Sequence, residues 1–166
     1  MELLINKNLI ASYLQVAIGV SDSEVNTFIR ETQEIDFREK VCEDFYHDVL
    51  SNRTAPGYQL LFKGGEYAYD GKTYYNPGLN KILAYWAYAR LIERSNKVST
   101  THGVVRKTSP ASEPLTQSEL DRSARLYRHD ADMYWQDFKK YMDRNDETFT
   151  NWEGEKRSSF KTSVIK

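Results

Sequence analysis

The sequence predicts a mainly α-helical fold: a helical bundle of about five helices with one β-hairpin and an extended arm. Three observations predict it. Apolar residues recur at steps of three and four over most of the first 145 residues, as on one face of a helix. Residues 66–75 lack that period and flank a turn, and residues 95–114 have no regular period. We expect one helical domain over residues 1–145 and an extended C-terminal tail over residues 146–166.

Three helices are expected before residue 52. The first begins near Asn6 and ends near Gly19. The second follows at once, because Ser21 and Glu24 have the spacing of a capping box. A third start is expected at Asp36, followed by apolar residues at helical spacing that predict a half-buried helix: Val41, Cys42, Phe45, Tyr46 and Val49.

Residues 66–75 predict a two-residue β-hairpin. Asp70-Gly71 suits a type I′ turn, which needs positive φ at both central positions. A turn there pairs Tyr69 with Lys72 and Tyr67 with Tyr74, so these three tyrosines share one face of the hairpin. Because an isolated hairpin is marginal in water, we expect it to pack on the helices or on another subunit.

The next helix is expected to begin at Asn76-Pro77, with Asn as the cap and Pro at the first helical position. From Leu79 to Ile92 it is apolar nearly all round. A helix without a polar face is surrounded by other elements. This segment is therefore predicted to be the central core helix.

Residues 95–114 are rich in Ser, Thr, Pro and basic residues, and we interpret them as an arm. Thr116 and Glu119 then form a second capping box, which opens the longest helix. Its apolar residues alternate steps of four and three, and we favour a core-facing stripe over an intermolecular coiled coil. The stripe comprises Leu120, Ala124, Tyr127, Ala131, Tyr134, Phe138 and Tyr141.

Composition narrows the class of protein. The net charge of -1 gives no general attraction to nucleic acid. The single cysteine, Cys42, cannot form an internal disulfide, and the N-terminus does not resemble a secretory signal. No stretch is long and apolar enough to span a membrane, so no membrane association is expected. The 12 tyrosines favour surfaces that pack on one side and stay wet on the other.

No catalytic, cofactor-binding or metal-binding residues are expected. Gly65 and Gly71-Lys72-Thr73 are one residue too far apart for a phosphate-binding loop, and no helix follows directly. Glu39, Glu43 and His47 have metal-site spacing, but they lie opposite the apolar residues of the third helix and predict a solvated face. The alternative function left open is a small helical regulatory or metal- or ligand-binding module of a mobile element.

Several short sequence motifs occur in a characteristic order between the second helix and the arm. They are Phe28-Ile29-Arg30-Glu31-Thr32-Gln33-Glu34 with Asp36, Tyr58 to Leu61, Gly64-Gly65-x-Tyr67, Pro77-Gly78-Leu79, Ala84-Tyr85-Trp86-Ala87-Tyr88-Ala89-Arg90, and Thr101-His102-Gly103-Val104-Val105-x-Lys107. Their order and spacing resemble a family of head-tail connector proteins from tailed bacteriophages of Bacteroides-type bacteria, including crAss-like phages.

The resemblance implies a structural virion protein of the neck, made in the host bacterial cytoplasm. It implies a homo-oligomeric ring, usually dodecameric, that joins the portal protein to tail or further neck proteins. DNA would pass through its lumen without sequence-specific binding. A heterologous ring needs two different patches on each subunit, and we expect them in the hairpin, the arm and the tail. The candidate interface residues are Tyr67, Tyr69, Tyr74, His102, Gly103, Val104, Val105, Arg106, Lys107, Trp152 and Phe160.

Overall fold

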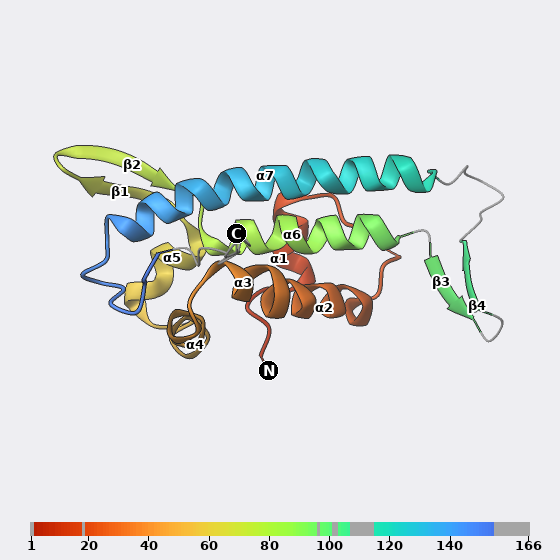
Figure 1. The fold of residues 1–166 in the computed structure, drawn as a ribbon, viewed down its shortest axis with the longest axis horizontal. Helices are drawn as coiled ribbons and strands as arrows, with labels where there is room; N and C mark the ends of the chain where they lie inside the picture. The colour runs from red at the N-terminus through yellow and green to blue at the C-terminus, as the bar shows by residue number, and fades with distance from the viewer. Residues whose placement is uncertain (1, 18, 96, 101–102, 107–114, 155–166) are drawn as a thin grey trace, which may run out of the picture.

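A computed structural model describes residues 2–17, 19–95, 97–100, 103–106 and 115–154. The predicted mainly α-helical fold is confirmed. Two long antiparallel helices, α6 (Leu79–Arg94) and α7 (Gln117–Asp143), run along the long axis of the molecule (Figure 1). The remaining helical segments precede them in the chain: α1 (Lys7–Tyr13), α2 (Asp22–Glu31), a π-helical segment (Thr32–Phe37), α3 (Arg38–Lys40), α4 (Glu43–Ser51), a 3-10 turn (Pro56–Tyr58) and α5 (Gln59–Lys63).

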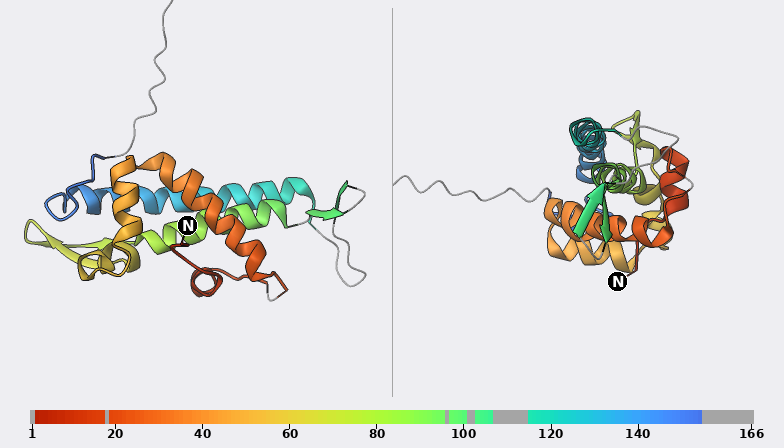
Figure 2. Two further views of the ribbon diagram at one scale, coloured as in Figure 1. Left: turned by 90° about the horizontal axis from the view of Figure 1, so that it is seen from below. Right: turned by 90° about the vertical axis from the view of Figure 1, so that its right-hand side faces the viewer.

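Helix α6 is the centre of the core, as the sequence predicts. Nine of its side chains are buried, and α7, α2 and α1 surround it when the molecule is viewed along its axis (Figure 2). The stripe on α7 faces inward, which confirms the core-facing interpretation. Tyr134 of this stripe lies 5.2 Å from Tyr85 of α6 between ring centroids, and Trp135, which the predicted stripe did not include, lies 5.9 Å from Trp86 of α6.

Side-chain caps begin three helices at the expected residues. Asn6 accepts from Leu9 N at 2.9 Å and Ser21 accepts from Glu24 N at 3.2 Å. Thr116 and Glu119 form the reciprocal capping box of α7. The first helix is shorter than expected, however, because the backbone is already extended at Leu14.

The expected helix start at Asp36 is wrong. The chain stays helical from α2 through the π-helical segment to α3, and breaks only at the extended residue Val41. The wider π turn brings Thr32, Gln33 and Phe37 onto the buried side together. The Asp36 carboxylate is bound by Arg90 rather than capping a helix.

The expected start at Asn76-Pro77 is also wrong, because α6 begins at Leu79 with Gly78 as its cap. Asn76 is the last residue of a strand and is fully buried. Its side chain accepts from Gly78 N at 3.0 Å and donates to Leu60 O at 2.8 Å. Helix α5, which contains Leu60, had no expected counterpart.

The segment interpreted as an arm contains a second antiparallel hairpin. Strands β3 (Lys97–Thr100) and β4 (Gly103–Arg106) pair with Val98 opposite Val105. This hairpin lies at the end of the molecule opposite the first one (Figure 1). Residues 96, 101–102 and 107–114 of the arm, which include His102 and Lys107, lie outside the described residues.

The first part of the expected extended tail packs on the core instead. Phe149 and Trp152 are 1% and 8% exposed. Trp152 lies against Phe45 at 5.2 Å between centroids, and its indole nitrogen donates to Asp143 at 2.7 Å. Residues 146–154 therefore belong to the domain, because they cover its α4 side. Phe160 lies outside the described residues.

Replacing Trp152 by Ala is expected to lower the free energy of unfolding by about 3–5 kcal/mol, because the substitution leaves a cavity against Phe45. Urea denaturation followed by fluorescence measures this. The exposed neighbour Glu153→Ala is the control and should change stability by less than about 0.5 kcal/mol. Equal stability of the two variants would contradict the packed position of Trp152.

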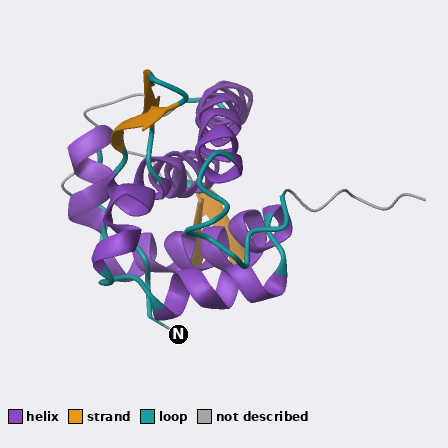
Figure 3. Cartoon of the chain, turned by 90° about the vertical axis from the view of Figure 1, so that its left-hand side faces the viewer, coloured by secondary structure: helices purple, strands orange, loops and turns teal. Residues whose placement is uncertain are grey.

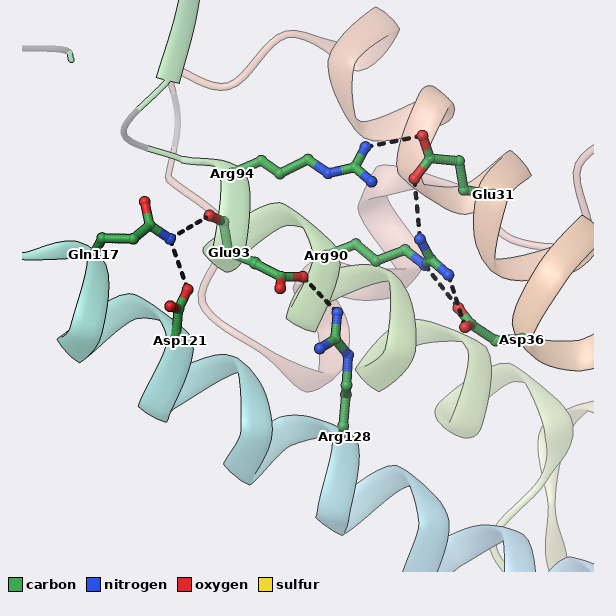
Figure 4. A network of polar contacts seen from close by, with 8 residues as sticks. All are labelled: Glu31, Asp36, Arg90, Glu93, Arg94, Gln117, Asp121 and Arg128. Atoms are coloured by element: carbon green, nitrogen blue, oxygen red, sulfur yellow. Dashed lines mark hydrogen bonds and ion pairs between the residues drawn. The ribbon is translucent and has the colours of Figure 1, made fainter. Parts of the chain in front are cut away.

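Ion pairs fix α6 on two sides (Figure 4). Arg90 donates two hydrogen bonds of 2.7 Å to Asp36 and a third of 3.2 Å to Glu31. Hydrogen bonding to Asp36 raises the pKa of the Arg90 guanidinium above its usual value. On the other side, Arg128 of α7 lies 2.5 Å from Glu93. The Arg90 pair therefore joins the π-helical segment to the core helix.

Replacing Arg90 by Lys is expected to destabilise the protein by about 2 kcal/mol, because an ammonium group cannot make the two parallel bonds to Asp36. Arg94→Lys is the matched control, since Arg94 is more exposed and makes a single bond of 2.9 Å to Glu31. Urea denaturation of both variants measures the difference. If both lose the same stability, the Asp36 pair is not the anchor.

Candidate interaction surface

The first hairpin has the predicted strands, turn and register. Strands β1 (Gly65–Tyr69) and β2 (Lys72–Asn76) pair Tyr69 with Lys72 and Tyr67 with Tyr74. Asp70 and Gly71 have φ of 49° and 69°, which fits a type I′ turn. The hairpin projects from the end of the molecule near the C-terminus of α7 (Figures 1 and 3).

Two glycines fix the base of this hairpin. Gly64 and Gly78 both have positive φ, of 73° and 81°. A Cβ atom on Gly78 would lie 2.5 Å from Gly64 N and 2.6 Å from Lys63 C, so the two backbones touch without room for a side chain. This contact holds the end of α5 against the start of α6 and thereby orients both strands.

Tyr67, Tyr69 and Tyr74 share one face, which we call the tyrosine face. The Tyr67 and Tyr74 rings lie 5.8 Å apart and those of Tyr69 and Tyr74 lie 6.4 Å apart. The face turns toward α7, where Tyr67 is buried against Tyr141 at 4.9 Å. Burial, with a smaller contribution from Tyr67, raises the pKa of Tyr141 to about 12, so the phenol stays protonated.

Arg144, directly after α7, completes the tyrosine face. Its guanidinium lies 3.9 Å from the ring centroid of Tyr74 and 5.2 Å from that of Tyr69, and it donates to Tyr67 Oη at 2.9 Å. No carboxylate in the described part of the chain lies within ion-pair distance of Arg144. The cation is held by aromatic rings instead.

A hollow of about 190 Å³ lies beside this cluster, lined by Tyr67, Tyr74, Tyr75, Asp137, Lys140 and Arg144. Tyr69 and Tyr75, on opposite faces of the hairpin, are 46% and 63% exposed. Tyrosine and arginine are enriched where proteins bind one another. The hairpin tip and Arg144 therefore form a surface suited to a protein partner, and we call it the tip surface.

The candidate residues fall into three groups. Tyr69, Tyr74 and the buried Tyr67 are brought together at the tip surface. Residues Gly103 to Arg106 form strand β4 at the other end, while His102, Lys107 and Phe160 lie outside the described residues. Trp152 lies in the core of its own chain.

Sequence reasoning missed Arg144 and Tyr75. Arg144 follows the last turn of a long helix among charged residues, and nothing in its neighbours marks it. Only the register of the hairpin combined with the length of α7 brings it over the tyrosines. Tyr75 was passed over because its side chain alternates to the other face.

The group Glu39, Glu43 and His47 is not assembled into a site. The break at Val41 separates Glu39 from the helix that carries the other two, and Glu43 and His47 lie 3.9 Å apart with both side chains exposed. Within the described residues no set of three potential metal ligands converges. None of the described helices is long and apolar enough to cross a membrane.

These features define a small, mainly α-helical protein with a hairpin at each end and a tyrosine-arginine surface at one of them. The model of a family described as a family of unknown function (DUF6712) matches residues 38–161, and the chain belongs to this family. The match begins in α3 and includes both hairpins, α6 and α7. No curated protein and no solved structure matches the chain.

Replacing Gly78 by Ala is expected to destabilise the protein by about 3 kcal/mol or more, because the new methyl group would meet the backbone of Gly64 at a strained φ. Thermal unfolding followed by circular dichroism measures this. Gly57→Ala is the control, since a Cβ there meets no atom within 4 Å and should change stability by less than about 1 kcal/mol. A stable Gly78→Ala variant would contradict the close contact at the hairpin base.

Proposed function

We propose that the chain is a structural virion protein, a head-tail connector subunit that forms a ring. One surface of the subunit binds the portal protein, and another binds tail or further neck proteins. The ring extends the DNA channel, and DNA passes without sequence-specific binding. The observation that carries the proposal is the placement of two hairpins at opposite ends of the α6–α7 pair (Figure 1).

A connector subunit must contact different partners on different sides, because its ring lies between two unlike assemblies. The two hairpins supply such separated contacts without altering the helical core. At one end the tip surface offers exposed tyrosines and an arginine. At the other end β3 and β4 pair only with each other within the described residues, and the edge of such a sheet can accept a strand from a neighbour.

Charge and sequence support the same proposal. A net charge of -1 suits a channel that lets DNA slide, since a strongly basic lumen would retain it. The order of the short sequence motifs between Phe28 and Lys107 resembles that of connector proteins. Assembly in the particle as a dodecameric ring and synthesis in the host cytoplasm are parts of this proposal.

Quantitative mass spectrometry of purified particles of the encoding phage tests the proposal. The expected result is about one copy per copy of the portal protein, because a ring whose subunits each bind one portal subunit repeats the rotational symmetry of the portal. A host protein of similar abundance in the lysate serves as the control for contamination. Absence from particles would overturn the proposal.

A variant of this experiment tests whether the tip surface takes part in assembly. Particles from cells that supply the Tyr69→Ala/Tyr75→Ala double variant should contain markedly fewer copies, because exposed tyrosines at the centre of an interface contribute strongly to binding. Lys72→Ala on the same hairpin is the matched control and should be incorporated normally. Equal incorporation of the double variant and of Lys72→Ala would show that the tip surface does not contribute to assembly.

The alternative, a regulatory or metal-binding module, is tested in the purified protein. Replacing Glu39, Glu43 and His47 together by Ala should leave the metal content unchanged if the protein is a connector. A zinc or manganese ion found in the wild-type chain and lost in the variant would favour the alternative.

A further inference from the structure

The outward side of α7 carries an exposed stripe that lies away from the core. Eight exposed residues form it, and we call it the outer stripe: Glu119, Arg122, Leu126, His129, Asp130, Met133, Asp137 and Lys140. At 100° per residue these positions lie opposite the buried side of α7, which includes Trp135. In Figure 2 α7 lies at the margin of the molecule, with α6 on its inner side.

Two large apolar residues stand at the middle of the outer stripe. Leu126 is 60% exposed and Met133 is 56% exposed. They are seven residues apart, so they project from the same side of the helix two turns apart. Neither packs on the core of its own chain, and each would lose water contact if a second helix lay along the stripe.

The residue types of the outer stripe are arranged symmetrically about its midpoint. Its midpoint lies between His129 and Asp130. Leu126 and Met133 are equally far from this midpoint, and so are Arg122 and Asp137, and Glu119 and Lys140. Each apolar position thus mirrors an apolar one, and each charge mirrors the opposite charge.

We propose that a second copy of this chain binds the outer stripe, with the two α7 helices antiparallel and related by a two-fold axis at this midpoint. In such a pair Leu126 of each copy lies beside Met133 of its partner. Arg122 then lies opposite the partner's Asp137, and Glu119 opposite the partner's Lys140, so two clusters of four alternating charges flank an apolar centre.

The existing contacts of these residues allow the pairing. Thr116 donates to Glu119 through its backbone N and its Oγ1 at 2.8 and 2.7 Å, but both bonds go to Oε2, so Oε1 of Glu119 can accept from the partner's Lys140. Lys140 lies 2.8 Å from Asp137 within its own helix, and both side chains are more than half exposed. Arg122 has no carboxylate of the described residues within ion-pair distance, so it can bind the partner's Asp137 without breaking a bond. Antiparallel alignment also places opposite ends of the helix dipoles side by side.

The pair is weak on its own. One helix face against another buries less than the roughly 1,200 Å² typical of stable specific complexes. The two-fold contact also closes on itself and cannot propagate around a ring. This inference therefore does not rest on the proposed function, and its failure would leave that function untouched.

Sedimentation velocity over roughly 1 to 200 μM of the full-length protein tests the contact. We expect a reversible monomer–dimer equilibrium that Leu126→Glu or Met133→Glu weakens at least tenfold, because each places a charge in the apolar centre. Both sites are exposed, so circular dichroism and thermal unfolding should show an unchanged fold. A monomer at every concentration would overturn the proposal, as would an oligomer that these substitutions leave unaffected.

Charge reversal tests the pairing of opposite charges. Arg122→Asp and Asp137→Arg should each weaken the dimer severalfold, and the double variant should restore it, because the opposite charges then exchange places. Arg125→Asp is the matched control, since it makes the same change of charge on α7 outside the stripe. Equal weakening by Arg122→Asp and Arg125→Asp, or no recovery in the double variant, would overturn the proposal.

Cysteine cross-linking tests the direction and register. In a Cys42→Ser background, Leu126→Cys chains mixed with Met133→Cys chains should form a disulfide-linked dimer on mild oxidation. Leu126→Cys alone should not, because its two copies would stand about 10 Å apart along the paired helices. Efficient cross-linking of the single variant would show parallel pairing and overturn the antiparallel arrangement.

Discussion

The enclosure of α6 is the constraint on which the rest of the structure depends. A helix with nine buried side chains on all sides cannot face water, so every other long element must cover part of it. Helix α7 covers one side along its length, α1 and α2 cover others, and Arg90 secures the π-helical segment to it. The two hairpins are then attached at the two ends of α6, and its length sets the distance between them.

The sequence motifs that resemble connector proteins belong mostly to the framework around α6. Glu31, Asp36 and Arg90 form one ion-pair cluster. Gly64 and Gly78 form the backbone contact at the hairpin base. These residues are needed for the shape of the chain, and therefore the resemblance bears first on the framework and only through it on the assembly that we propose.

Local interactions were predictable and long-range ones were not. Three side-chain caps and the Asp70-Gly71 turn depend on residues within four positions of each other, and the sequence predicts them correctly. Asp36 looked like a cap, but its partner Arg90 is far along the chain. Trp152 looked like part of a loose tail because its partner Phe45 comes before α6 and α7. Half of the tip surface was predicted, since hairpin register follows from local pairing while the position of Arg144 does not.

Helix α7 has two stripes because an amphipathic helix on the edge of a domain always presents a second side. Folding specifies only the inner one, where Trp135 and Phe138 are fully buried. Charged residues alone would keep the outer side in water, and Leu126 and Met133 add nothing to the core. Glu119 also caps the start of α7 and Lys140 pairs with Asp137 in its own helix, but neither contact accounts for the two exposed apolar residues at the centre of the symmetric order. The second copy of the chain presents that order, which is why a two-fold pair accounts for the apolar and the charged positions together.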